Sequence, residues 1–124
     1  MTSGSPVHEA LAHLDGNFEA FKKTLIDLSK IPSISASPFP KEAVQKSAAA
    51  IADALREVGV ENVQVLTLEG VHPYVYGDFL HKKGAPTLLL YGHHDVQPVG
   101  NESRWATSPF EPVEKGGRLY GRGT

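Results

Sequence analysis

One short stretch of the sequence places side chains that can bind a metal ion or transfer protons directly after an apolar run. Residues 86–91 are mostly apolar, Gly92 follows, and then come His93, His94 and Asp95. Side chains two positions apart in an extended chain point the same way, so His93 and Asp95 are expected to share one site while His94 points elsewhere. A carboxylate beside an imidazole orients a metal-bound histidine and also suits acid–base chemistry. The stretch is therefore predicted to form the edge of an active site.

A surface loop is the competing interpretation, because a histidine and an aspartate two residues apart also occur by chance. The other histidines have no partner at ligand spacing and are expected at the surface or in packing contacts; they are His8, His13, His72 and His81. Three serines that follow the first predicted helix stand in no nucleophile-elbow context and are expected to cap helices or turns; they are Ser33, Ser35 and Ser37.

The elements that must position this stretch follow from the spacing of apolar residues. Apolar side chains three and four positions apart predict a helix from about His8 to Lys30, and a second from about Val44 to Val58 that ends at Gly59. Alternating apolar residues predict strands at 63–68 and 74–80.

The apolar run at 86–91 is short and bounded by turn-forming residues, which predicts a buried strand. Ligands of α/β sheets bind where the strands end, and His93 and Asp95 follow the end of this predicted strand. Residues 114–118 predict a hairpin turn. Two helices followed by strands and an active-site loop predict the α/β class, with a mixed sheet flanked by helices.

Composition excludes several classes of site and partner. The 124 residues contain 12 basic and 14 acidic side chains without a charged block, so no nucleic-acid partner is expected. No cysteine is present, which excludes disulfides and thiolate metal sites and leaves histidine and carboxylates as metal ligands. No segment reaches membrane-spanning length, and the first residues do not resemble a signal peptide. The cytoplasm is the expected location, with no membrane partner.

Three stretches resemble the co-catalytic zinc peptidases in their order and spacing. They are Tyr91–Pro98, Trp105–Pro112 and Arg118–Thr124. Ile31–Ser35 at the end of the first predicted helix and His72–Pro73 also match the family pattern. This family includes carnosinase-type dipeptidases, aminoacylase, acetylornithine deacetylase and succinyl-diaminopimelate desuccinylase. The Asp-Val-Gln-Pro sequence at 95–98 is most similar to the dipeptidase branch.

The resemblance implies roles for individual residues. His93 matches the family's first metal ligand, and Asp95 matches its catalytic aspartate, which orients a ligating imidazole. His94 falls at a variable position. Residues 121–124 match the approach to an aspartate that bridges two metal ions. That aspartate, the general-base glutamate, the other ligands and the lid domain are not among the 124 residues, so residues 1–124 are expected to be the N-terminal portion of an α/β/α catalytic domain.

The function implied by the resemblance is zinc-dependent hydrolysis of dipeptides or N-acyl amino acids by a longer, homodimeric enzyme. Two zinc ions are expected in each complete active site, with cobalt or manganese as substitutes. The 124 residues alone are expected to be inactive. The alternative is a truncated, non-catalytic product that acts as a weak binding module. An aspartate encoded shortly after Thr124 would favour the enzyme, and a stop codon would favour the binding module.

Overall fold

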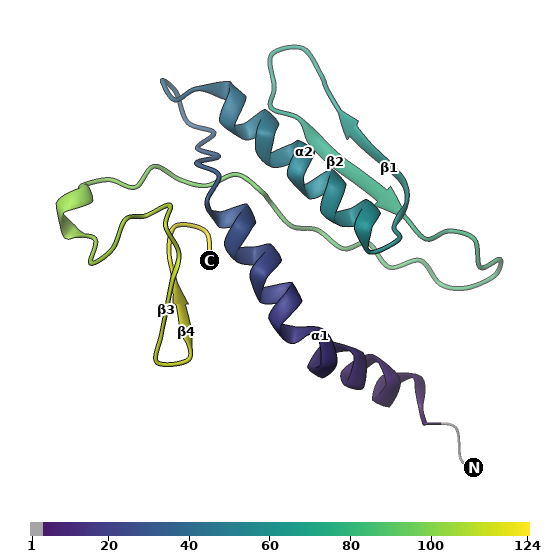
Figure 1. Ribbon diagram of the computed structural model, residues 1–124. Helices are drawn as coiled ribbons and strands as arrows, with labels where there is room; N and C mark the ends of the chain where they lie inside the picture. The colour runs from purple at the N-terminus through teal and green to yellow at the C-terminus, as the bar shows by residue number, and fades with distance from the viewer. Residues whose placement is uncertain (1–3) are drawn as a thin grey trace.

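Two α-helices carry most of the regular structure in the computed structural model, which describes residues 4–124 (Figure 1). Helix α1 spans Pro6–Ser29 and begins after Ser5, whose hydroxyl accepts a hydrogen bond from the backbone N–H of His8 (3.4 Å). Helix α2 spans Lys41–Glu57. Gly59 follows it with a φ of +83°, a conformation that glycine adopts without strain. Both predicted helices are confirmed.

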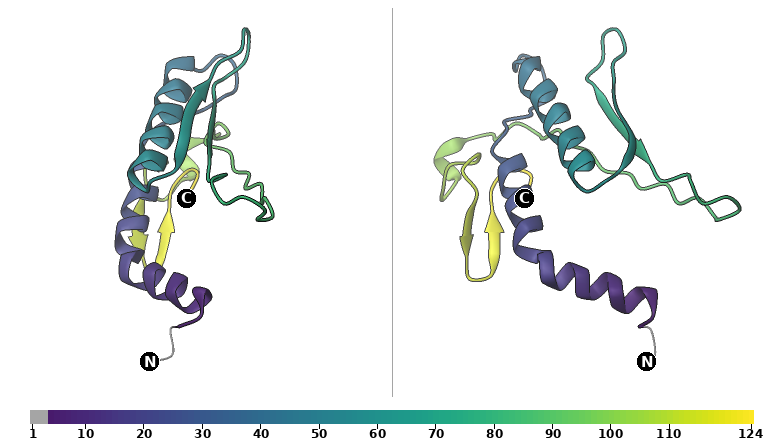
Figure 2. Two further views of the ribbon diagram at one scale, coloured as in Figure 1. Left: turned by 90° about the vertical axis from the view of Figure 1, so that its right-hand side faces the viewer. Right: turned by 45° about the vertical axis from the view of Figure 1, so that its right-hand side comes forward.

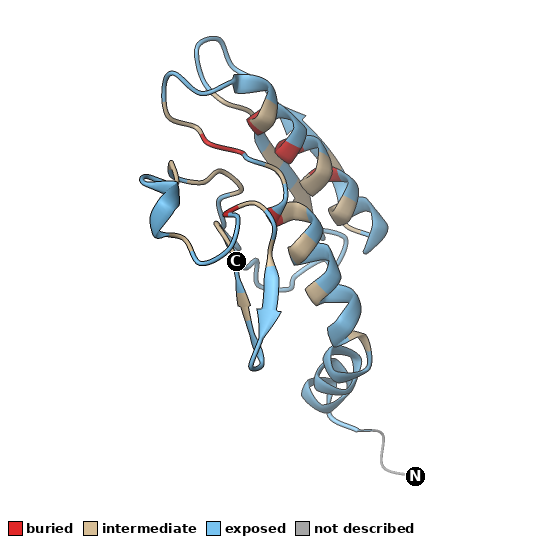
Figure 3. Ribbon diagram, turned by 60° about the vertical axis from the view of Figure 1, so that its left-hand side comes forward, coloured by how far each residue is buried: buried red, intermediate tan, exposed pale blue. Residues whose placement is uncertain are grey.

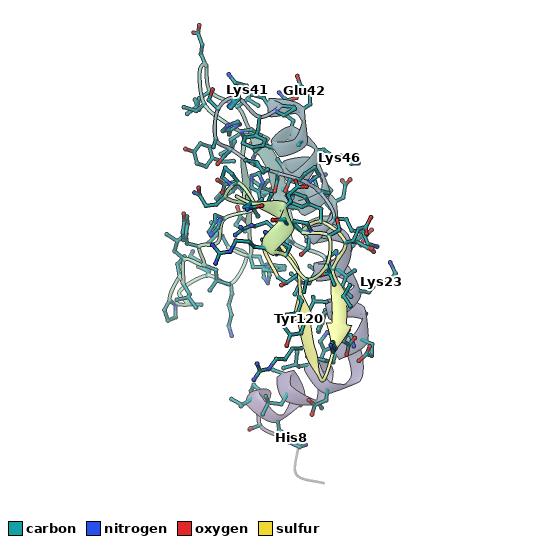
Figure 4. All side chains as sticks on the ribbon, turned by 90° about the vertical axis from the view of Figure 1, so that its left-hand side faces the viewer. His8, Lys23, Lys41, Glu42, Lys46 and Tyr120 are labelled. Carbon is teal, nitrogen blue, oxygen red and sulfur yellow. The ribbon has the colours of Figure 1, made fainter. Side chains whose placement is uncertain are left out.

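The core lies between α2 and a two-stranded antiparallel sheet, which run side by side (Figure 2). The sheet consists of β1 (Glu61–Leu66) and β2 (Tyr74–Asp78), with Val65 opposite Val75. One face of α2 is buried through residues spaced four apart; they are Val44, Ala48 and Ala52. The outer side of the helix carries exposed polar residues, among them Lys41, Glu42 and Lys46 (Figure 4). The apolar periodicity of α2 thus anchors the only sizeable core in residues 4–124.

An irregularity at the start of β1 is held by polar side chains. The strand register shifts between Glu61 and Gln64, and Asn62 adopts a φ of +52°. The Asn62 amide donates to one carboxylate oxygen of Asp78 (2.9 Å), and the Tyr76 hydroxyl donates to the other (2.8 Å). These two hydrogen bonds lower the pKa of Asp78, although partial desolvation acts in the opposite direction.

The predicted hairpin near the end of the sequence is confirmed. Strands β3 (Val113–Lys115) and β4 (Arg118–Tyr120) pair antiparallel. They are joined by Gly116 and Gly117, both with positive φ, which is the backbone that a tight hairpin turn requires. An ion pair of 2.9 Å between Lys22 and Glu114 links this hairpin to α1.

The prediction of a buried strand at 86–91 is wrong for residues 4–124. This segment contains no strand, and Leu88, Leu89, Leu90 and Tyr91 are 80–89% exposed. A strand takes its hydrogen bonds and its burial from neighbouring strands, and the described residues place no neighbour beside this run. The apolar face of α1 is also largely exposed, and buried residues gather on α2 and on the loop after α1 (Figure 3).

The α/β class is nevertheless confirmed, since helices pack with strands along the chain. Every strand pair described is antiparallel, apart from one isolated parallel bridge between Ile34 and Val96. No helix within residues 4–124 is long and apolar enough to cross a membrane.

Candidate active site

The side chains of His93 and Asp95 lie together, as the alternation of an extended chain predicts. His93 Nδ1 is 3.3 Å from Asp95 Oδ1 and donates to the backbone carbonyl of Asp95 (2.9 Å). Because a carbonyl can only accept, Nδ1 carries the proton and the lone pair of neutral His93 is on Nε2. The His93 side chain is 71% exposed. Its Nε2 is therefore oriented as an accessible ligand atom.

The carboxylate of Asp95 is held from its other side by a serine that is distant in the sequence. The hydroxyl of Ser35 donates to Asp95 Oδ2 at 2.6 Å. This hydrogen bond is the main reason why the pKa of Asp95 is lowered; partial burial opposes it, and the neighbouring His93 reinforces it. The two oxygens of Asp95 thus have different partners, Ser35 on one side and His93 on the other.

His94 points away from this pair and into the contact between α2 and the segment before β2. Its Nδ1 is 3.1 Å from the Ser47 hydroxyl, and its Nε2 is 3.2 Å from the Pro73 carbonyl oxygen. The backbone carbonyl of His94 accepts hydrogen bonds from the Ser33 hydroxyl (2.8 Å) and the Ser47 hydroxyl (3.1 Å). His94 therefore anchors the loop and does not join His93 and Asp95.

The segment after α1 runs alongside the loop and fixes its backbone. The backbone N–H of Val96 donates to the carbonyl of Ser33 (3.0 Å), next to the parallel bridge between Ile34 and Val96. The expectation that Ser33 and Ser35 only cap helices or turns is wrong, because both hydroxyls bind the loop that carries His93. The available signal was their position within Ile31–Ser35, one of the stretches that match the family pattern.

His72 also contacts the site, and the available signal in the sequence was the match of His72 and Pro73 to the family pattern. Its Nε2 donates to the backbone carbonyl of Ser35 at 3.0 Å. This histidine stands before β2, so its contact joins the sheet region to the segment that holds Asp95. His72 was expected to have a surface or packing role. Its contact is closer to the site than that, because it binds the carbonyl of Ser35, and Ser35 in turn binds Asp95.

The turn at 121–124 packs against the far end of the loop. Arg122 donates from its backbone to the Pro109 carbonyl (2.7 Å) and from Nη2 to the Pro98 carbonyl (3.3 Å). Its guanidinium lies 4.9 Å from the ring centroid of Trp105. The Trp105 indole N–H in turn donates to the Val99 carbonyl (2.9 Å). These contacts place the end of the chain beside the candidate site.

His93 could supply one of the ligands of a metal site. His93 has a fixed ring orientation and an accessible Nε2, which suits a zinc ligand. Residues 4–124 contain no group of three histidine, aspartate or glutamate side chains that could hold a metal ion. Since a catalytic zinc usually takes three protein ligands, His93 would need partners from outside these residues.

Comparisons with known proteins agree with the sequence motifs. Residues 89–124 match the model of Peptidase family M20/M25/M40. Beta-Ala-His dipeptidase of Mus musculus is 32% identical over 93% of this chain and 26% of its own length. Succinyl-diaminopimelate desuccinylase of Stenotrophomonas maltophilia is 54% identical over 36% of this chain and 12% of its own length. The chain spans about a quarter of the length of the dipeptidases that it matches.

Two solved structures share the fold of this chain. Human carnosine dipeptidase 1 superimposes with a TM-score of 0.83 and 27% identity, over 97% of this chain and 27% of the human protein. The dipeptidase Dug1p of Saccharomyces cerevisiae gives a TM-score of 0.78 and 25% identity, over 89% of this chain and 26% of the yeast protein. The predicted resemblance is therefore confirmed: this chain resembles Peptidase family M20/M25/M40 in the motifs of residues 89–124 and its dipeptidases in fold.

Proposed function

We propose that residues 1–124 are the N-terminal portion of the catalytic domain of a metal-dependent peptidase. The whole protein would hydrolyse the amide bond of dipeptides or N-acyl amino acids. The observation that carries this proposal is the His93–Asp95 pair, which lies within the residues matched by the peptidase family model. The names of the similar proteins, Beta-Ala-His dipeptidase and succinyl-diaminopimelate desuccinylase, supply the two substrate classes.

The chain's own residues would divide the work at this site. His93 would bind a metal ion through Nε2, and Asp95 would keep the imidazole oriented and basic through Nδ1. A bound zinc ion would supply Lewis acidity toward the amide carbonyl and lower the pKa of a bound water molecule. Cobalt or manganese could serve instead, because imidazole and carboxylate ligands accept all three ions.

The test is hydrolysis by the whole protein that carries residues 1–124, before and after removal of metal. A panel would contain β-Ala-His, α-dipeptides, and N-acetyl and N-succinyl amino acids. We expect cleavage of at least one of these classes, loss of cleavage after chelation, and recovery on adding zinc, cobalt or manganese. The His93→Ala variant is the matched control, because added metal should not restore it fully.

Two results would contradict the proposal. Hydrolysis that resists chelation would remove the metal from the mechanism. A metal-loaded whole protein that cleaves nothing in the panel would favour the alternative of a non-catalytic binding module.

A homodimer and a cytoplasmic location are also part of the proposal. Sedimentation of the whole protein would test the first, and cell fractionation would test the second.

A further inference from the structure

The hydrogen bond between Ser35 and Asp95 has no role in the function proposed so far, yet it is the shortest polar contact of the site. Asp95 Oδ2 accepts from the Ser35 hydroxyl at 2.6 Å, while Oδ1 lies 3.3 Å from His93 Nδ1. A carboxylate can rotate about the bond that joins it to Cβ, and the bond to Ser35 opposes this rotation. It therefore keeps Oδ1 directed at the imidazole.

The backbone of Ser35 is fixed independently of this hydroxyl. Val96 donates to the carbonyl of Ser33 (3.0 Å), Ile34 forms the parallel bridge with Val96, and His72 donates to the carbonyl of Ser35 (3.0 Å). Ile34 is buried. The hydroxyl consequently starts from an anchored position and can impose an orientation on Asp95.

Among the hydroxyls of residues 4–124, Ser35 alone bonds the Asp95 carboxylate. Ser33 and Ser47 both donate to the carbonyl of His94, which belongs to the oppositely directed residue of the loop. The other side chain at this carboxylate is His93, whose Nδ1 lies 3.3 Å from Oδ1. Loss of its hydroxyl would leave Oδ2 without a partner from the described part of the protein.

We propose that Ser35 is a positioning residue, which orients the Asp95 carboxylate and through it the imidazole of His93. The proposal rests on the function given above and adds a residue outside the His-x-Asp triplet to the machinery of the site. Ser35 acts from a different segment of the chain, so the orientation of the predicted ligand depends on the docking of residues 33–35 against residues 94–96.

Three variants of the whole protein test this role. Ser35→Ala removes the hydroxyl, Ser35→Thr keeps it, and Ser37→Ala is the matched control in the same loop, at an exposed serine. We expect Ser35→Ala to lower kcat about 10-fold with KM changed less than twofold, as for other groups that orient metal ligands. Ser35→Thr should recover most of this loss, and Ser37→Ala should behave like the parent. Unchanged thermal unfolding would show that Ser35→Ala still folds.

A double-mutant cycle with Asp95→Asn separates positioning from general stability. If Ser35 acts through the Asp95 carboxylate, Ser35→Ala should add less than a twofold loss in the Asp95→Asn background. Fully multiplicative losses, or equal effects of Ser35→Ala and Ser37→Ala, would overturn the proposal.

Zinc affinity, measured by competition with a chromogenic chelator, keeps the two proposals distinguishable. A parent that cleaves nothing but binds zinc, with affinity weakened by Ser35→Ala and restored by Ser35→Thr, would overturn the hydrolase and support the positioning role. An active parent that is insensitive to Ser35→Ala would overturn the positioning role alone. A parent that neither cleaves the panel nor binds zinc would overturn both.

Discussion

Gly123 lies so close to Val96 that a Cβ atom on the glycine would be 2.8 Å from Val96 Cγ1. Val96 is the residue whose backbone pairs with Ser33 beside the candidate site. The contact therefore couples the turn at 121–124 to the loop that carries His93 and Asp95. A side chain at position 123 would push the two segments apart, and the φ of +87° would strain it as well.

Gly123→Ala should destabilise the whole protein more than the same change at an open turn. Left-handed backbone costs a residue with a side chain about 1–2 kcal/mol, and the contact with Val96 adds to this cost. Gly84→Ala is the control, since Gly84 has a similar φ of +79° and no atom within 4 Å of an added Cβ. Urea unfolding of both variants measures the difference. Equal loss of stability would show that the turn moves away without cost.

Metal occupancy should separate the roles of the three residues in the loop. His93→Ala should remove a metal ligand and lower the metal content. Asp95→Asn should retain much of the metal but lower turnover by about 10–100-fold, the usual range for groups that orient ligands. His94→Ala should cost stability, because its ring contacts Ser47 and Pro73, with metal content close to that of the parent. Elemental analysis and kinetics on the whole protein measure these effects, and a metal loss in His94→Ala equal to that in His93→Ala would reverse the assignment.

The stabilising effect of Asp78 should depend on pH in a defined direction. Hydrogen bonds from Asn62 and Tyr76 lower the pKa of Asp78 in the folded protein. The carboxylate therefore stabilises the fold above its unfolded pKa of about 3.9, and this contribution is lost as the pH falls through the lower folded value. Urea unfolding should find Asp78→Asn less stable than the parent near pH 6, with the difference shrinking below pH 4. A constant difference over this range would exclude the carboxylate charge as its cause.

Expressed alone, the 124 residues should aggregate and show no peptidase activity. Leu88–Tyr91 expose their apolar side chains, and exposed apolar segments with unpaired backbone groups favour association. Leu89→Lys should raise the soluble yield of the isolated chain, whereas Leu68→Lys, at a less exposed leucine outside this run, should do so less. Light scattering as a function of protein concentration measures the aggregation of each variant. Submicromolar zinc affinity together with peptidase turnover would contradict the prediction, because it would show that these residues suffice for function.

The parts of the fold that could be predicted from the sequence are those specified by local patterns. The apolar spacing of α1 and α2 sets their helical faces, and the Gly116–Gly117 pair sets the hairpin turn. The same reasoning failed at 86–91, because a run that is apolar on both faces becomes a strand only when other strands accept its hydrogen bonds. Its amino-acid sequence carries no information on whether those neighbours are present.

In the candidate site, too, the sequence predicts what depends on local geometry and misses what depends on contacts between distant segments. The alternation of His93, His94 and Asp95 follows from the geometry of an extended chain, and the structure places the first and third together. The contribution of Ser35 could not be derived in this way, because its partner lies 60 residues further along the chain. A serine after a helix has many ordinary uses in caps and turns, and only the tertiary contact with Asp95 distinguishes it from them.

The hydrogen bonds that hold the loop carrying His93 join residues far apart in the sequence, which has a consequence for biosynthesis. Ser35 and Asp95 are 60 residues apart, and Ser47 and His94 are 47 apart, whereas α2, β1 and β2 follow one another within residues 41–78. At roughly 5–20 residues per second, the ribosome needs about 3–12 s to make the partner of Ser35. Residues 41–78 therefore leave the ribosome before the loop that carries His93, and this loop can dock onto a layer of α2, β1 and β2 that has already packed.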